Sequence, residues 1–150
     1  MQYLTETGNW LVVLGALLIV SACVVLHYEA LNACNRHLPK LSQRRRPRVL
    51  ILIVVVLITH VAEIWLFGLG YFVLVHGYGA GALAGLTTSD LPDFVYFSAA
   101  TFTTLGFGDA VPVGAIRFLA GMEALTGFVL VTWSASYTFL EMQRDWRGGE

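Results

Sequence analysis

Charged side chains are scarce in this sequence. Of its 150 residues, 13% are Asp, Glu, Lys or Arg, whereas 57% are hydrophobic. Soluble domains carry about 25% charged residues, so a soluble fold of this size would have little polar surface to present to water. The net charge of −1 does not by itself indicate a charged partner. The composition therefore favours a protein whose solvent is the lipid bilayer.

Other absences exclude particular functions. No apolar run carries Arg or Lys at every third position, which excludes a voltage sensor of the usual kind. The sequence GFGD (106–109) is a motif of intramembrane aspartyl proteases, but these need a second Asp in a neighbouring span, and no Asp lies within an apolar run. We therefore expect no enzymatic activity. The two cysteines, Cys23 and Cys34, belong to one predicted helix and cannot easily bridge each other, so packing is their simplest role.

Three apolar runs are long enough to cross a membrane. They cover residues 10–34, 49–77 and 113–142, and about 20 apolar residues suffice for a spanning helix. The helices of a soluble bundle need polar outer faces, which these runs lack. We expect an all-α membrane protein that forms a single domain over 1–150, with transmembrane helices at 9–34, 47–77 and 113–142.

The basic residues gather on one side of this predicted topology. The segment between the first two runs and the C-terminal tail hold eight of the nine: Arg36, Lys40, Arg44, Arg45, Arg46, Arg48, Arg144 and Arg147. The positive-inside rule makes that side cytoplasmic and places the N-terminus outside. The cluster Arg44, Arg45, Arg46 and Arg48 could also bind anionic lipid headgroups. Binding of nucleic acid is the disfavoured alternative.

A short helix is predicted between the second and third runs. Residues 77–92 are rich in glycine and indicate a flexible outer loop. Residues 93–103 then form about three helical turns, with Ser89 or Asp90 as a cap and Pro92 tolerated at the first turn. A helix too short to span, followed by irregular backbone, is tolerated at membrane depth only where it is buried in protein or lines water. This pattern predicts a re-entrant pore loop.

The stretch TFTTLGFGDAVP (101–112) places two glycines two positions apart. A backbone that directs successive carbonyl oxygens to one side needs left-handed dihedrals at alternate residues, which glycine adopts at little cost. Rings of carbonyls can replace the hydration shell of an ion. The C-terminal end of the preceding helix also favours a cation. Gly106 and Gly108 therefore predict a cation filter at 104–109, with Leu105 and Phe107 packed behind it.

The sequence TTLGFGD (103–109) resembles the signature filter of potassium channels, Thr-x-Gly-Tyr/Phe-Gly-Asp. Pro112, the aromatic residues Tyr96 and Phe97, and a glycine in the third run, Gly127, also resemble that family. The resemblance covers about 49–142, so the first helix is an addition to the two-helix plan of small bacterial channels. It implies a homotetramer in a bacterial inner membrane that conducts K⁺ passively, with no cofactor other than the ions in the filter.

The resemblance also implies roles for individual residues. The ion-binding residues would be Thr104, Leu105, Gly106, Phe107 and Gly108, supported by Thr103 and Asp109. The third helix would be the inner helix, with a hinge at Gly127 and a cavity face formed by Phe128, Val131, Ala135 and Phe139. Phe139, nearest the cytoplasm, is a candidate hydrophobic gate; packing against lipid or another helix is the alternative.

Two positions depart from the family pattern. Phe107 replaces the commoner Tyr, so the hydroxyl that can brace the filter is absent. Ala100 lies where some bacterial channels have a glutamate that pairs with the filter aspartate, so Asp109 must find another partner or face water. A nonselective or sodium-permeable cation channel of the same architecture is therefore the alternative function.

Glu123, His60 and Glu63 are the ionisable side chains of the predicted spans that are candidates for a function. Glu123, in the third span, is expected to hydrogen-bond to the pore loop and brace it; a packed acid without that role is the alternative. His60 and Glu63 share one face of the second span, because they lie three residues apart on a helix. They could form a proton or metal site, but two ligands are too few to assign a metal.

Overall fold

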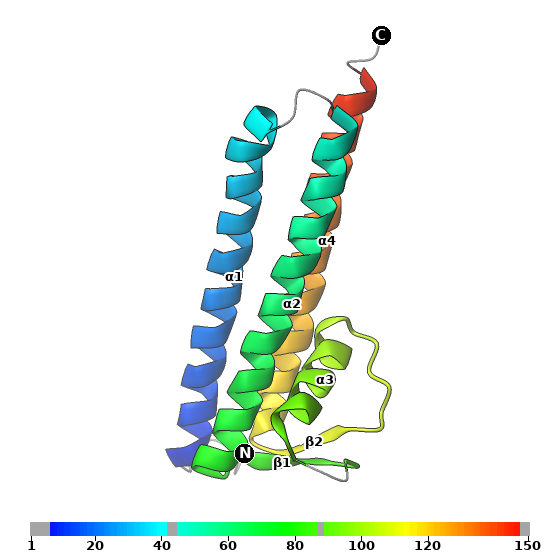
Figure 1. Cartoon of the computed structure of the whole chain (residues 1–150). Helices are drawn as coiled ribbons and strands as arrows, with labels where there is room; N and C mark the ends of the chain where they lie inside the picture. The colour runs from blue at the N-terminus through cyan, green and yellow to red at the C-terminus, as the bar shows by residue number, and fades with distance from the viewer. Residues whose placement is uncertain (1–6, 42–44, 87–88, 148–150) are drawn as a thin grey trace.

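The computed structural model describes residues 7–41, 45–86 and 89–147. Its elements are α1 (Thr7–Leu41), α2 (Arg45–Tyr78), β1 (Gly81–Ala84), α3 (Leu91–Phe102), β2 (Val111–Gly114) and α4 (Ile116–Arg147). The three long helices run side by side, and α3 and the two strands lie at the end of the molecule that holds the N-terminus (Figure 1).

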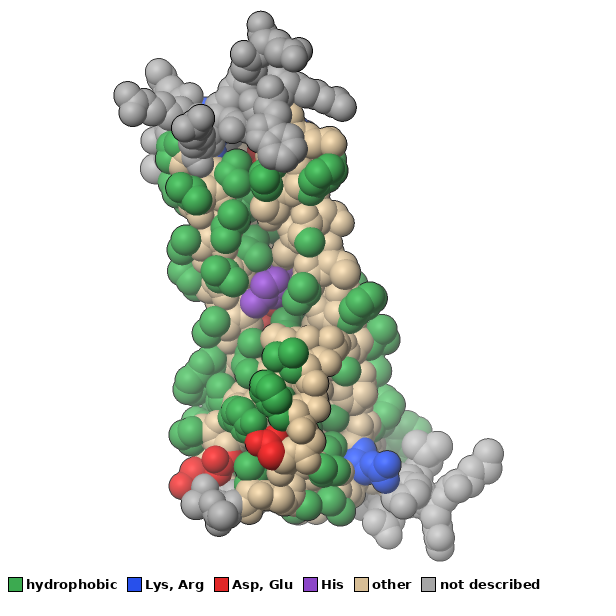
Figure 2. Space-filling model, turned by 90° about the vertical axis from the view of Figure 1, so that its right-hand side faces the viewer, with side chains coloured by type: hydrophobic (Ala, Val, Ile, Leu, Met, Phe, Trp, Pro, Cys, Tyr) green, Lys and Arg blue, Asp and Glu red, His purple; other side chains and the backbone are tan. Residues whose placement is uncertain are grey.

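The three long helices have the length and composition of membrane spans. Their apolar segments are Asn9–His37, Pro47–Tyr78 and Ile116–Arg144. Apolar side chains are spread over most of the height of the face shown in Figure 2. Many large apolar side chains of the long helices are exposed; Leu18, for example, is 72% exposed. Such a surface suits lipid and not water. The predicted fold class, a helical membrane protein with three spans, is confirmed.

The helix boundaries differ from the predicted ones at both ends of the bundle. The inner helix begins at Ile116 and not at 113, because residues 111–114 form β2. This strand pairs with β1 in antiparallel register, with Gly81 opposite Gly114 and Ala84 opposite Val111. The segment predicted as a flexible outer loop is thus partly paired to the chain that follows the predicted filter. At the other end, α1 continues to Leu41, beyond the predicted end at 34, because a helix can extend past the hydrocarbon region.

The core lies where α3 meets the long helices. Five large side chains at this contact are almost fully buried: Phe67 and Tyr71 of α2, Phe94 and Phe102 of α3, and Leu119 of α4. From α1, the buried side chains Val12, Ala16 and Cys23 join the same cluster. This packing fixes the short helix against α2 and α4, and so determines where the segment after it begins.

Candidate functional site

The short helix α3 positions the predicted filter. Asp90 is its N-cap residue, Pro92 lies in its first turn, and the Asp93 carboxylate accepts a hydrogen bond from the Asp90 amide at 3.4 Å. At the other end, the Thr103 hydroxyl donates to the carbonyl of Ala99 at 2.7 Å. The chain then leaves α3 and returns along it to β2, at the end of the molecule that holds the N-terminus (Figure 1). This path is that of a re-entrant loop.

The backbone of this loop alternates between left-handed and ordinary dihedrals. Positive φ angles occur at Thr104 (60°), Gly106 (53°) and Gly108 (82°), and not at the residues between them. A Cβ atom added at Gly106 or Gly108 would meet nothing within 4 Å. These positions therefore use glycine for its dihedral freedom and not for space. The alternation is the backbone geometry that the spacing of the two glycines predicts.

Thr104 extends the alternation by one position that the sequence reasoning missed. A β-branched residue with positive φ is an outlier, and such strain costs about 1–3 kcal/mol. Strained backbone of this kind is typical of functional sites. The signal in the sequence was the equal spacing of residues 104, 106 and 108, but threonine gives no dihedral preference that would have revealed it.

Asp109, the aspartate of the predicted filter, has a partner on α3. The Tyr96 hydroxyl donates to Asp109 Oδ2 at 2.6 Å, and the Ala110 amide donates to Asp109 Oδ1 at 3.0 Å. Tyr96 lies one helical turn before Ala100, the position where the sequence offered no partner. The hydrogen bond to Asp109 raises the pKa of the Tyr96 phenol, so the donor keeps its proton at neutral pH.

The two apolar side chains of the loop have different surroundings. The ring of Phe107 is parallel to that of Tyr96, with 6.4 Å between their centroids and 3° between their planes. Leu105 and Phe107 are each 66% exposed in the single chain. The expected packing behind the loop is therefore only partly made within one chain, and both side chains offer apolar surface to a neighbour.

Glu123 lies behind the loop in the buried centre of the helix packing. The Tyr71 hydroxyl of α2 donates to its Oε2 at 2.5 Å, and the Ser98 hydroxyl of α3 donates to its Oε1 at 2.5 Å. Ser98 Oγ also lies 2.8 Å from the carbonyl oxygen of Ile64. Glu123 thus joins the inner helix to both α2 and the short helix. No sequence pattern indicated Tyr71 and Ser98 as its partners, because they lie 52 and 25 residues away in the chain.

Gly127 is a point of close approach between α4 and α3. A Cβ atom here would lie 2.0 Å from the carbonyl oxygen of Phe102, 2.8 Å from its carbonyl carbon and 2.9 Å from its Cα. The helix α4 is continuous through this position. Packing against the end of α3 therefore explains the glycine without a hinge. A hinge motion at Gly127 stays a prediction.

One face of α4 is exposed in the single chain. It carries the predicted cavity residues Phe128 (60% exposed), Val131 (42%) and Phe139 (53%), together with exposed Ala135. The buried residues Glu123, Leu130 and Ser134 occupy the other face. The exposed face is available to line a pore or to meet other helices.

The basic segment lies at the opposite end of the molecule from the loop. Arg44 is outside the described residues, and Arg45, Arg46 and Arg48 lie in the first turns of α2. That end of α2 is beside the end of α4, whereas the N-terminus and the sheet lie at the other end (Figure 1). The arrangement keeps the basic segments on one side of the candidate membrane spans.

Comparison with known proteins gives one family. A family model described as ion channel matches residues 49–144, which run from α2 to α4 and include the loop. Protein LctB of Geobacillus stearothermophilus is 36% identical over 61 residues, or 41% of this chain and 46% of that protein, so the chain spans less than half of this relative. No solved structure matches the chain significantly. Because the family match covers well over half of the sequence, and the fold has the expected re-entrant loop, the chain belongs to the ion channel family as a small pore-loop channel.

Proposed function

We propose that this chain forms a homotetrameric, potassium-selective channel that conducts K⁺ passively through a filter built from residues 104–108. The observation that carries the proposal is the alternation of positive φ at Thr104, Gly106 and Gly108. Carbonyl oxygens that follow one another on one side of a backbone can replace the hydration shell of K⁺. No other ligand or cofactor is required for passive conduction.

The tetramer follows from the number of filter segments. A ring of carbonyls takes four such segments, and each chain contributes one. Exposed apolar side chains around the loop and on α4, such as Leu105, Phe107 and Phe128, offer surfaces for neighbouring subunits. In this arrangement the loops of four chains meet at one axis, with the Thr104 hydroxyl adding an oxygen layer at the inner end.

The remaining residues have supporting roles in this proposal. Asp109 holds the loop to Tyr96 of α3, and Thr103 bonds to Ala99 at the end of α3. Glu123 supports the loop indirectly, because it joins α4 to α3 through Ser98. The exposed face of α4 lines the cavity below the filter, with Gly127 as its hinge and Phe139 as its gate. K⁺ is then the only ion that the channel conducts.

The proposed orientation follows the basic residues. The end of the bundle with the first turns of α2 faces the cytoplasm, and the N-terminus and the loop face outward, in a bacterial inner membrane. The cluster Arg44, Arg45, Arg46 and Arg48 would meet anionic lipid headgroups on the cytoplasmic side.

A nonselective or sodium-permeable cation channel is the second candidate. Weak support of the filter favours this candidate. Phe107 has no hydroxyl that could donate a hydrogen bond, and the residue that holds Asp109 is Tyr96, which is 40% exposed. A loosely held filter can accept ions of more than one radius.

Flux through purified protein in liposomes separates the two candidates. Liposomes loaded with K⁺ or with Na⁺ are diluted into medium free of that ion, and a protonophore with a pH-sensitive dye reports cation efflux. We expect rapid efflux of K⁺ and none of Na⁺ above that of empty liposomes. Equal efflux of both ions would favour the nonselective channel, and no efflux of either would refute a passive pore. Native mass spectrometry of the same protein should give a tetramer.

A further inference from the structure

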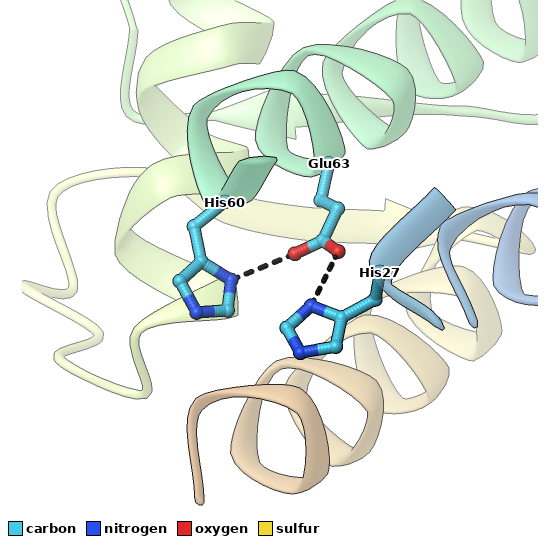
Figure 3. Close-up of side chains that lie close together, drawn as sticks. All are labelled: His27, His60 and Glu63. Carbon is cyan, nitrogen blue, oxygen red and sulfur yellow. Dashed lines mark hydrogen bonds and ion pairs between the residues drawn. The ribbon is translucent and has the colours of Figure 1, made fainter. Parts of the chain in front are cut away.

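Two histidines and one glutamate meet in the middle of the helix bundle. Glu63 of α2 lies between His27 of α1 and His60 of α2 (Figure 3). The Nδ1 atom of His27 is 3.0 Å from Glu63 Oε1, and the Nδ1 atom of His60 is 2.7 Å from Glu63 Oε2. One ligand atom from each of the three residues lies within 4.8 Å of those of the other two. Two of the three were visible on one face of the second span, and α1 supplies the third.

A serine of the inner helix completes the cluster. Ser134 Oγ lies 3.1 Å from Nε2 of His60 and 3.2 Å from Nε2 of His27. Each imidazole ring therefore has Nδ1 toward the carboxylate and Nε2 toward the hydroxyl. His27 and Glu63 have no exposed surface, and Ser134 is 4% exposed. The four side chains come from α1, α2 and α4, which the cluster joins.

We propose that His27, His60 and Glu63 form a binding site for a divalent transition-metal ion of the zinc class. Two imidazole nitrogens and a carboxylate oxygen are a ligand set that zinc accepts, with a fourth position left for water. Zinc holds such atoms at about 2.0–2.2 Å, so tetrahedral ligands lie about 3.4 Å from one another. The two nitrogen–oxygen pairs, now at 3.0 Å to Oε1 and 2.7 Å to Oε2, need to separate by about 0.4–0.7 Å to reach that spacing. The three ligand atoms already lie within 4.8 Å of one another, so small side-chain rotations bring them to it.

Ser134 fits the second shell of such a site. A metal bound through Nδ1 leaves the proton of a neutral imidazole on Nε2, and ligating histidines almost always donate that other N–H to an oxygen. Here the Nε2 atoms of both rings already face one hydroxyl oxygen, which has two lone pairs to accept them. The arrangement thus provides the ligands and the groups that orient them.

The competing explanation is a ring of hydrogen bonds without a metal. Hydrogen bonds among the two imidazole rings, the carboxylate and the Ser134 hydroxyl can satisfy the same polar atoms, since each of these groups faces another. Ionisable residues inside a membrane are energetically costly and indicate a functional site by default, so both the metal site and the hydrogen-bonded ring imply a role for this cluster. The side chain of His60 is 14% exposed, and histidine atoms reach the surface in Figure 2 at mid-height. An ion could enter from that face.

The site adjoins the pore loop. The ring of His60 lies 5.7 Å from that of Phe102, measured between centroids, and Phe102 ends α3 two residues before Thr104. An ion held here would tie the additional helix α1 to α2, and Ser134 would link it to α4. Binding of the metal thus stabilises one arrangement of all three long helices beside the base of the loop.

Metal binding to the purified full-length protein tests the proposal. Zn²⁺ and Co²⁺ are titrated separately by equilibrium dialysis, after removal of metal with a chelator. We expect one ion per chain and a Co²⁺ absorption spectrum typical of tetrahedral nitrogen and oxygen ligands. His27→Gln, His60→Gln and Glu63→Gln should each weaken binding at least tenfold. Ser134→Ala should weaken it by about 10–100-fold with the three ligands kept, as loss of a second-shell partner does.

The chain offers matched histidine controls. His37 and His76 are exposed, and each ring faces a carbonyl oxygen one turn earlier in its own helix. His37→Gln and His76→Gln should bind metal as the unaltered protein does. Gel filtration of every variant shows whether it is folded, and the Co²⁺ spectrum of the unaltered protein needs no variant. Absence of binding at micromolar Zn²⁺ and Co²⁺, or binding that survives all three ligand substitutions, would overturn the proposal and leave the hydrogen-bonded ring.

Discussion

Alanine at position 127 adds a methyl group where the end of α3 leaves no room for one. The new Cβ atom would lie 2.0 Å from the carbonyl oxygen of Phe102, and ordinary contact begins at 3.4 Å. The three nearest atoms are all backbone, so no side chain can rotate away. The end of α3 and the start of the loop must move by about 1.4 Å to reach ordinary contact.

The cost of this substitution follows from overpacking. Overfilled cores lose about 1–3 kcal/mol, and a rigid backbone neighbour favours the upper end of that range. Alanine regains about 0.5–1 kcal/mol relative to glycine in a helix. We therefore expect a net loss of about 2 kcal/mol per subunit, which corresponds to a fall of about 4–8 °C in the midpoint of thermal unfolding for a chain of this length.

Gly121 is the matched control for Gly127. It lies in the same helix, and a Cβ atom there would meet nothing within 4 Å. Gly121→Ala should leave the unfolding midpoint unchanged or raise it slightly. Tryptophan fluorescence during heating of the purified protein measures the unfolding midpoint of both variants. Currents in planar bilayers show whether ion conduction through the loop has changed. If Gly127→Ala were as stable as Gly121→Ala, with an unaltered filter, the close-packing explanation would be refuted and the hinge would be favoured.

Three further substitutions test the support of the loop and the inner helix. Tyr96→Phe removes the donor to Asp109 and should speed the decay of current, and an unchanged decay would contradict this role of Tyr96. Because the pKa of Tyr96 is raised above its usual value of about 10, the decay of current in the unaltered channel should not change from pH 7 to 9. Glu123→Gln leaves one buried hydroxyl facing an NH₂ group and should cost about 1–3 kcal/mol of stability, whereas Glu141→Gln, which removes only an ion pair with exposed Arg144, should cost no more than about 1 kcal/mol; equal thermal shifts would argue against the brace. Phe139→Ala should increase the open probability in single-channel records if this side chain is the gate, and Leu140→Ala on the neighbouring face should not.

The sequence was most informative where a periodic or compositional rule applies. Apolar runs of more than 20 residues predict spanning helices with little ambiguity, and the spacing of Gly106 and Gly108 predicts the alternating backbone. The four-residue strands were not predictable, because Gly81–Ala84 and Val111–Gly114 are too short to show an alternating pattern. Their pairing depends on where α3 places the chain.

Contacts between helices that are distant in the chain could not be predicted from the sequence. Glu123 could be identified as a buried acid, but its donors are on two other helices. His60 and Glu63 were recognisable as one helical face, whereas His27 joins them from 36 residues away through packing of a helix that the family pattern lacks. Gly127 shows the opposite limit, because a family resemblance suggested a hinge where the structure gives a steric reason for the glycine.

The reversal potential under bi-ionic conditions tests the central claim most directly. Purified channels in a planar bilayer are recorded with K⁺ on one side and an equal concentration of Na⁺ on the other. Each tenfold preference for K⁺ moves the reversal potential by about 59 mV for a monovalent ion, so a hundredfold preference gives about 118 mV. We predict a shift of at least this size toward the K⁺ equilibrium value. We also predict its loss in Gly106→Ala, where the methyl group meets no atom within 4 Å but the backbone has φ of 53°. A clear current that reverses near zero in the unaltered protein would contradict potassium selectivity and establish the nonselective channel.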